Sequence, residues 1–328
     1  TAIGYAALGS LTTGTANTGV GHQAGNSVVD SSHSTAVGYN ALVLSTGGSN
    51  TAIGSRSLDA NTTGTGNTSI GVDCLGGNTT AINNTAVGNN AAKENTTGTS
   101  NVAVGAFAML DNTTGDNNTV LGESALGNNT TASNNTAIGK NALVANTTGQ
   151  QNTVVGSLAD QVNTTSSGIS AFGYSALKVN TAGQNSAFGS FALGSNTSGG
   201  SNTALGYQAL RQATTANNNT AVGWRAMDAN TTGAENVAVG KGALFANTTG
   251  DSNTAVGALA LDAATTADQN TAVGREALSS TTTGDNNVAI GSYAMNNATQ
   301  ADRNVVVGAQ TMTSYSATGD NYSTVVGF

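Results

Sequence analysis

The side chains able to carry acid–base, nucleophilic or metal chemistry are few and scattered along the sequence. Its 328 residues include two histidines, His22 and His33, one cysteine, Cys74, 17 Asp and Glu, and nine Lys and Arg. No HExxH motif, phosphate-binding glycine loop, zinc-ligand spacing or nucleophile elbow occurs. Because an active site gathers several such groups at one place, we expect no enzyme activity and no cofactor. The histidines fall in irregular early segments, where we expect exposed loop positions.

Calcium is the one metal for which the sequence offers oxygen ligands. The segment TGDNN, at 114–118 and 283–287, sets a carboxylate beside two amides, which are ligand types that Ca²⁺ takes. Neither copy matches the GGxGxDx pattern of calcium-binding rolls. The simpler interpretation of the carboxylates is a solvated edge that keeps the chain soluble.

Charge and hydropathy exclude two classes of partner. The net charge is −8, and the basic residues never cluster, so we expect no nucleic acid partner, which would need a basic face. No run of eighteen apolar residues is present, so we expect no membrane span in this segment.

A seventeen-residue repeat runs along the chain, and it determines the secondary structure in which the candidate functional residues lie. Residues 135–151 read NTAIGKNALVANTTGQQ, and residues 236–252 read NVAVGKGALFANTTGDS. The consensus N-T-A-V-G-x-x-A-L-x-x-N-T-T-G-x-x, whose letters we number as positions 1 to 17, recurs about twenty times. The period is short, and each repeat contains β-branched residues and is interrupted by Gly. This pattern predicts an all-β fold, a parallel β-solenoid or β-roll of about twenty coils. We expect one repeat domain, residues 1–328, that starts and ends in mid-repeat as a segment of a longer fibre chain.

Positions 4 and 9 carry the large apolar side chains, and we assign both to the core. All four methionines stand at position 9 among leucines, as gap-fillers of one ladder. Cys74 stands at position 8, which is nearly always Ala, so we expect a small buried residue there rather than a reactive thiol. The core ladder predicted in this way includes Val104, Met109, Ile138, Leu143, Val222, Met227, Val239 and Leu244.

Position 3 is nearly always Ala and never charged, and by strand alternation it faces away from position 4. A strand that is apolar on both faces is expected to be covered on both. One coil buries few large side chains, whereas ordering the backbone of seventeen residues costs on the order of 20 kcal/mol. Burial of position 3 against sister chains would therefore add stability to the fold. We therefore expect a homotrimer. Its predicted oligomer face contains Ala103, Ala137, Ala221 and Ala238.

Three surface features add functional hypotheses. Aromatic residues recur at position 6, and Tyr207 and Trp224 on adjacent coils form a candidate glycan-binding platform. Threonines at positions 2, 13 and 14 form ladders of the kind that an ice-binding face needs. The sequon Asn-Thr-Thr recurs at position 12 and marks candidate glycosylation sites, although turn formation explains the same residues. These sites are Asn61, Asn95, Asn112, Asn146, Asn230 and Asn247.

The motifs NTAIG and NVAVG resemble the inner-strand motif of trimeric autotransporter adhesin heads. That resemblance implies a β-roll that trimerises through this strand. The fuller pattern, NTAIG followed by ALxxNTTG, is similar to repeats of bacterial and phage proteins described as containing a tail-fibre domain. It covers essentially the whole chain.

Together these features predict a structural fibre, the shaft or head of an adhesin or tail fibre, that acts as a spacer and as a multivalent surface attachment. We expect it outside the cell or on a cell or virion surface, with a host-surface carbohydrate or protein as receptor. The alternatives are an ice-binding protein and a glycosylated surface filament.

Overall fold

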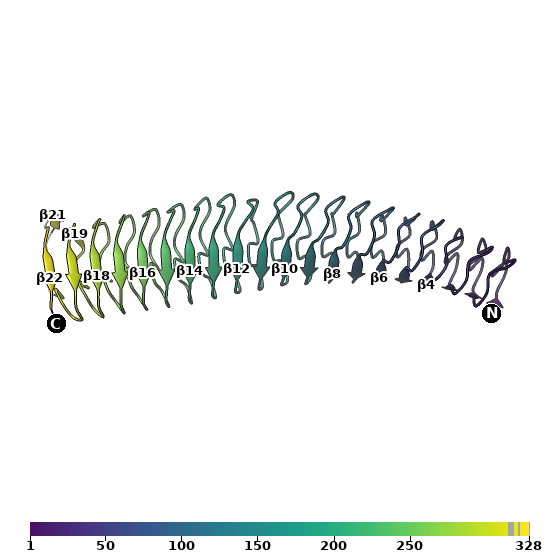
Figure 1. The fold of residues 1–328 in the computed structure, drawn as a ribbon, viewed down its shortest axis with the longest axis horizontal. Helices are drawn as coiled ribbons and strands as arrows, with labels where there is room; N and C mark the ends of the chain where they lie inside the picture. The colour runs from purple at the N-terminus through teal and green to yellow at the C-terminus, as the bar shows by residue number, and fades with distance from the viewer. Residues whose placement is uncertain (314–317, 321, 328) are drawn as a thin grey trace. The chain divides into compact units, whose positions relative to one another are not determined.

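The structure is a computed structural model that describes residues 1–313, 318–320 and 322–327. The described residues form β-strands and no helix, and most strands have three residues. The fold is the predicted all-β parallel β-solenoid, with a spacing of about seventeen residues per turn (Figure 1). Contacts divide the chain into two compact units, Thr1–Gly168 and Ile169–Phe328.

Unit 1 contains ten strands, one in each turn of the coil. Each strand pairs in parallel with the strand of the next turn, in a register that sets position 3 opposite position 3, as Val154 opposite Ala137. The strands are β1 (Ala2–Ile3), β2 (Thr18–Val20), β3 (Thr35–Val37), β4 (Thr51–Ile53), β5 (Thr68–Ile70), β6 (Thr85–Val87), β7 (Val102–Val104), β8 (Thr119–Leu121), β9 (Thr136–Ile138) and β10 (Thr153–Val155).

Unit 2 repeats this arrangement and adds a second, two-stranded ladder. The main ladder is built from β11 (Ser170–Phe172), β12 (Ser186–Phe188), β13 (Thr203–Leu205), β14 (Thr220–Val222), β15 (Val237–Val239), β16 (Thr254–Val256), β17 (Thr271–Val273), β18 (Val288–Ile290), β20 (Val305–Val307) and β22 (Thr324–Val326). The second ladder pairs β19 (Gln300–Asp302) with β21 (Thr318–Asp320).

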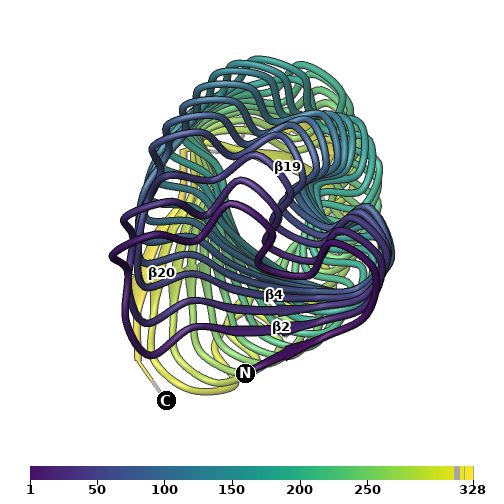
Figure 2. The same cartoon turned by 90° about the vertical axis from the view of Figure 1, so that its right-hand side faces the viewer.

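Backbone hydrogen bonds join successive turns outside the strands as well as within them. The Thr136 N–H donates to the Asn152 carbonyl at 2.8 Å, and the Leu143 N–H donates to the Ala159 carbonyl at 3.0 Å. In unit 1, successive turns consequently follow similar paths around the coil (Figure 2). The hydrogen bonds that stabilise one turn therefore come mainly from its neighbours, as expected for a solenoid.

Closing a coil in seventeen residues requires left-handed backbone at several points of each turn. Nearly every turn has positive φ at positions 7, 9 and 17, for example Asn141 at 56°, Leu143 at 52° and Gln151 at 59°. Position 5 is Gly, and a Cβ added to Gly139, whose φ is 125°, would lie 2.7 Å from the carbonyl carbon of Gly156. Since that contact is shorter than van der Waals distance and lies against backbone, Gly is needed there.

Rows of small apolar residues, leucines and asparagines fill the interior. Positions 3 and 8 are mostly Ala and position 9 is mostly Leu or Met, and outside the first and last turns they are close to 0% exposed. Leu143, Met109, Met227 and Leu244 are fully buried, which confirms the position 9 half of the predicted core ladder. Cys74 is also fully buried, as predicted.

Two buried asparagine ladders, at positions 1 and 12, cross the interior from turn to turn. Asn112 Nδ2 donates to Asn95 Oδ1 at 2.6 Å and to the Gly115 carbonyl at 3.1 Å, while Asn129 Nδ2 donates to Asn112 Oδ1 at 2.7 Å. Each side chain thus satisfies both its own turn and the next, which removes most of the cost of burying an amide.

The assignment of positions 3 and 4 from the sequence is wrong, because the two faces of the strand are exchanged. Position 3 lies inside the coil, and position 4 points outward and is partly exposed in every strand with described burial. The residues wrongly assigned to the core by this exchange are Val104, Ile138, Val222 and Val239. Those wrongly assigned to an oligomer face are Ala103, Ala137, Ala221 and Ala238, each 0 to 1% exposed within a single chain.

The narrow interior favours Ala at the inward position, although Val120, Val154 and Val306 also fit there and are 0% exposed. Gly19 stands at position 3, and a Cβ added there would lie 2.8 Å from Cγ of Leu8, in the position 9 row. The strand therefore packs directly onto the leucine row, and little space remains between them. In most strands the larger apolar residue lies outside.

Candidate functional site

The two histidines lie on the surface, as predicted. His22 is exposed, and its ring lies between those of Tyr5 and Tyr39, with centroid separations of 5.2 and 5.3 Å. His33 is exposed as well. Within the described residues, no group of three or more His, Cys, Asp or Glu side chains is placed to hold a metal ion.

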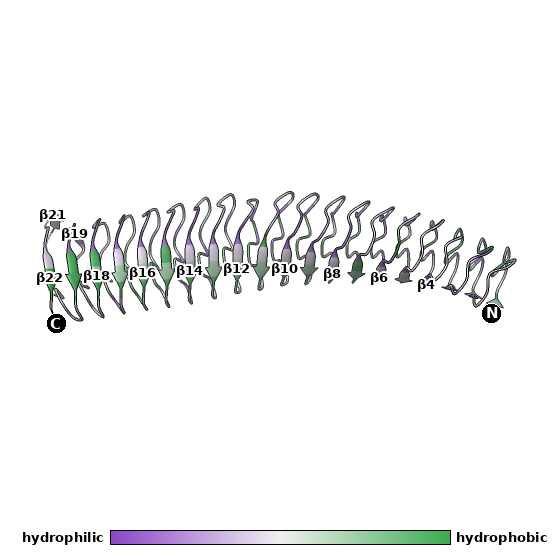
Figure 3. Ribbon diagram, viewed as in Figure 1, coloured by the Kyte–Doolittle hydropathy of each residue, from purple (hydrophilic) through white to green (hydrophobic). Residues whose placement is uncertain are grey.

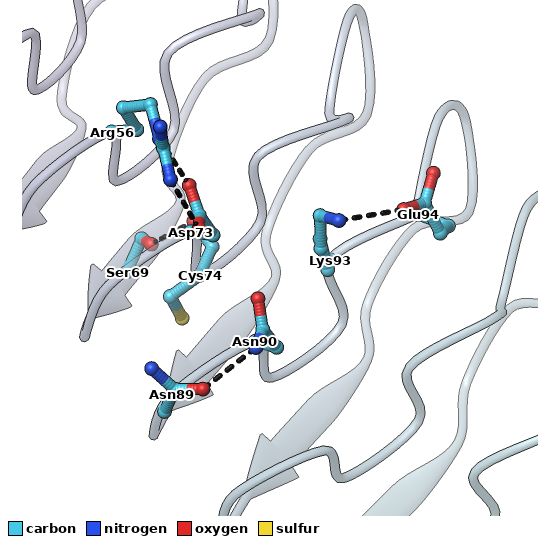
Figure 4. Close-up of polar contacts among 8 residues, drawn as sticks. All are labelled: Arg56, Ser69, Asp73, Cys74, Asn89, Asn90, Lys93 and Glu94. Atoms are coloured by element: carbon cyan, nitrogen blue, oxygen red, sulfur yellow. Dashed lines mark hydrogen bonds and ion pairs between the residues drawn. The ribbon is translucent and has the colours of Figure 1, made fainter.

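The buried cysteine belongs to a small polar cluster in the interior of unit 1. Ser57 Oγ donates to Ser69 Oγ at 2.7 Å, and Ser69 Oγ donates to the carbonyl of Cys74 at 2.7 Å. Figure 4 shows Ser69 and Cys74 with the nearby Arg56–Asp73 pair on the surface. Burial raises the pKa of the Cys74 thiol, so the group stays protonated and unreactive at neutral pH.

The aspartates of the two TGDNN segments bind backbone. Asp116 Oδ1 accepts the Thr99 N–H at 2.6 Å, and Asp285 Oδ1 accepts the Asp268 N–H at 2.7 Å. Four consecutive turns of unit 2 repeat this bond at position 16, with oxygens from Asp251, Asp268, Asp285 and Asp302. These carboxylates therefore act as caps between turns, which gives the hypothesis of calcium binding no support from geometry.

The six predicted N-glycosylation sites are wrong as sites on the folded chain. All stand at position 12 and are fully buried, with Nδ2 groups that donate hydrogen bonds inside the coil. A glycan on any of them would need the amide to leave the interior. They are Asn61, Asn95, Asn112, Asn146, Asn230 and Asn247.

In each unit the outward side of the strands is a regular surface, formed by positions 2 and 4, which we call the outer sheet face. Position 2 carries Thr, Ser or Val, and position 4 carries Val, Ile, Leu or Phe, so neither row contains a charge. Leu121 and Leu205 are each 49% exposed, and Phe172 and Phe188 stack with centroids 4.9 Å apart. Figure 3 colours β18 green for its apolar residues.

Threonines at positions 13 and 14 form a separate surface. Most position 13 hydroxyls donate to the carbonyl of the next turn, as Thr147 Oγ1 does to Thr164 O at 3.0 Å. Position 14 threonines, such as Thr148, are exposed. The predicted Thr ladders therefore exist, but position 2 lies on a strand while positions 13 and 14 lie in a bend.

Aromatic and basic side chains gather on unit 2. Phe191 contacts Tyr174 and Tyr207 edge to face, at centroid separations of 5.3 and 6.4 Å. Trp224 is 46% exposed, and its ring centroid lies 5.5 Å from Lys241 Nζ. Tyr207 is 45% exposed, so both it and Trp224 lie on the surface as predicted. The Tyr207 ring contacts Phe191, and the Trp224 ring lies beside cations. We call Tyr174, Phe191, Tyr207 and Trp224 the aromatic patch.

An ion cluster around one buried carboxylate contacts the patch at Trp224. Asp228 is 1% exposed and binds two arginines, with Oδ1 2.8 Å from Arg211 Nε and Oδ2 2.6 Å from Arg225 Nη2. The Arg225 guanidinium also lies 5.2 Å from the Trp224 ring centroid and 4.6 Å from that of Phe245. The sequence reading missed this cluster, because Arg211, Asp228 and Phe245 all stand at position 10, which otherwise varies.

Comparisons with known proteins give no family for this chain. No protein-family model matches the sequence, and the search of curated proteins finds no match. No helix within the described residues is long and apolar enough to cross a membrane.

Proposed function

We propose that this chain is a structural fibre segment that self-associates through its outer sheet face and serves as a spacer and surface attachment. The observation that carries the proposal is the uncharged row at position 4, repeated once per turn along each unit. A monomer gains nothing by exposing such a row, and continuous apolar patches of this kind usually mark interfaces.

The energy available to such an interface is substantial. Full burial of a Val, Leu or Ile side chain is worth roughly 1.5 to 3 kcal/mol, and residues such as Leu205 are about half exposed. Roughly 0.5 to 1.5 kcal/mol per turn therefore remains, and over about ten turns of one unit this is comparable to the 4 to 15 kcal/mol that association costs.

A second copy of the chain is the partner that fits this surface best. The row recurs at the spacing of the turns, and another copy has the same spacing. Neither row carries a charge that would oppose contact with itself. The homotrimer expected from the sequence remains our proposal, now through position 4 in place of position 3. The resemblance of the NTAIG motif to adhesin-head and tail-fibre repeats supports a place outside the cell or on a virion.

Sedimentation velocity of the purified chain tests the proposal. We expect an assembly of three chains, each of 32.0 kDa. The matched variants are Val239→Asp, in the apolar row, and Thr249→Asp, an exposed threonine at position 14 of the same turn. The first should dissociate the assembly and the second should not. A wild-type monomer at micromolar concentration would contradict self-association.

Ice binding is the second candidate, favoured by the in-register threonines at position 2 of the outer sheet face. It predicts thermal hysteresis by the monomer, since the ice-binding surface has to be free. The substitution Thr220→Tyr would interrupt the row, and the absence of hysteresis in the wild-type chain would exclude this candidate.

A further inference from the structure

Unit 2 carries a second surface whose chemistry differs from that of the outer sheet face. It comprises positions 6 to 11 of the three turns that contain Tyr207, Trp224 and Lys241. These segments hold three basic residues, Arg211, Arg225 and Lys241, and one acid, Asp228, so their net charge is three minus one, or +2. The whole chain has a net charge of −8.

We propose that this surface binds an acidic carbohydrate, with a pyranose ring on the aromatic patch and its carboxylate bound by Lys241 and Arg211. The inference rests on the proposed attachment role and names the chemical class of the receptor. An acidic sugar fits because it presents an apolar C–H face to an aromatic ring and a negative charge at the ring edge.

The rings are held in place for such a ligand. The Arg225 guanidinium contacts the rings of Trp224 and Phe245 and is bound twice by the buried Asp228 carboxylate, with Nε at 2.8 Å and Nη2 at 2.6 Å. These bonds fix the guanidinium against the Trp224 ring, which is 46% exposed. A preorganised platform loses little entropy when a ligand binds.

Two further cations belong to the turns before and after that of Trp224. Lys241, at position 6 of the following turn, is exposed, and the contact described for its ammonium group is with the Trp224 ring at 5.5 Å. Arg211, in the preceding turn, has a side chain 34% exposed, and its Nε contacts Asp228. The turns before and after Trp224 thus each supply one positive group. The next acid along position 10, Asp262, is one turn further on.

Several rings in succession favour a polymer over a single sugar. Tyr174, Phe191, Tyr207 and Trp224 come from four consecutive turns, and neighbouring turns lie about 4.8 Å apart. Successive sugars of an extended chain have a comparable repeat, so one ligand can contact several rings. Contacts of this kind are individually weak and add together.

The experiment is isothermal titration of the full chain with oligogalacturonate, at low and at moderate salt, with neutral cello-oligosaccharide and polyglutamate as comparison probes. We expect oligogalacturonate to bind with an affinity that falls as salt rises, and to bind at least about tenfold more tightly than either comparison probe. Trp224→Ala should weaken binding at least tenfold, and Lys241→Gln several-fold.

Unit 1 supplies matched controls at the same position of the repeat. Lys140→Gln removes an equivalent charge that pairs with Glu123, and Tyr39→Ala removes an exposed ring beside His22. Both should change the affinity less than twofold. Equal effects of Lys140→Gln and Lys241→Gln, equal binding of polyglutamate, or no oligogalacturonate binding would overturn the proposal. Sedimentation of the same samples reports self-association separately, so failure of one proposal is distinguished from failure of the other.

Discussion

An aspartate placed at Ala238 or at Val239 tests which face of the strand is inside the coil. The two residues are adjacent in β15, and Ala238 is 0% exposed while Val239 is 36% exposed. Ala238 pairs in register with Ala221 on one side and Ala255 on the other. The variants Ala238→Asp and Val239→Asp introduce the same charge one residue apart, so effects of net charge and strand propensity largely cancel between them.

The expected costs differ by several kcal/mol. At position 238 the carboxylate would enter an interior of Ala, Leu and Asn rows with no cation to pair with, which costs at least about 4 kcal/mol even after relaxation. At position 239 the substitution removes roughly two thirds of a valine's burial, about 1 to 2 kcal/mol, and leaves the charge in water. For a unit of 160 residues, each kcal/mol shifts Tm by about 2 to 4 °C.

Circular dichroism melts and sedimentation velocity of both variants provide the measurement. We expect Ala238→Asp to lower Tm by at least about 8 °C and Val239→Asp to lower it by a few degrees while abolishing self-association. Melting should be compared at a concentration where the wild-type chain is dissociated, because assembly itself raises Tm. If Val239→Asp melts lower than Ala238→Asp, the assignment of inner and outer faces is refuted.

Three further predictions concern the interior rows and the surface charges. Ala213 interrupts the position 12 ladder and leaves Asn196 Oδ1 without a donor, so Ala213→Asn should stabilise unit 2 by about 1 to 2 kcal/mol in denaturant titration, whereas Ala213→Ser should do less. Gly139→Ala forces a Cβ against the backbone of the next turn, and should cost about 2 kcal/mol or more; an unchanged denaturation midpoint would contradict the close approach. Arg56 lowers the pKa of Asp73 through a bidentate bond, so the pair's stabilisation is present above the ordinary pKa near 3.9 and is lost as pH falls below it. Because Arg56 is largely exposed and solvent screens the pair, Asp73→Asn should lower stability only slightly, seen as a flatter acid limb of stability against pH.

The sequence was sufficient for the period, the fold class and the leucine row. Gly at position 5 and turn residues at fixed offsets leave room only for short strands, and position 9 is large and apolar in most turns, as at Leu143 and Met227. Burial of Cys74 followed from its place in the alanine row at position 8.

The sequence was not sufficient to decide which face of the strand points inward. Alternation places Ala238 and Val239 on opposite faces, but it does not say which of them is inside. The usual rule that the larger apolar residue is buried fails here, because the width of the coil sets position 3 close to the leucine row, where most turns have Ala and a few, as at Val120, Val154 and Val306, have a larger residue. That width depends on the left-handed residues at positions 7, 9 and 17, and a leucine at φ near 50° is not a residue that sequence patterns assign to such a conformation.

The asparagines at position 12 were misread for a related reason. An Asn-Thr-Thr triplet reads equally well as a surface turn, as a glycosylation site or as an internal ladder. The turns stack so that Asn112 lies between Asn95 and Asn129, and only this stacking gives each buried amide its hydrogen-bond partners. The ladder is therefore stable in the interior. The basic and aromatic cluster around Asp228 shows the same limit, since its members meet across different turns.

The polar cluster of Ser57 and Ser69 has a consequence for how the chain finds its alignment during folding. In a coil of identical turns, the strands can pair in a register shifted by one whole repeat and lose only the contacts of a single turn. The correct and the shifted registers of a uniform coil therefore have similar free energies. Ser57 and Ser69 replace alanines in facing rows and bond each other at 2.7 Å. A slip by one repeat would separate Ser57 from Ser69 and leave the Ser57 hydroxyl buried opposite an alanine, while Ser69 would keep its bond to the Cys74 carbonyl of its own turn. The pair therefore penalises misalignment in unit 1 where the surrounding repeats do not.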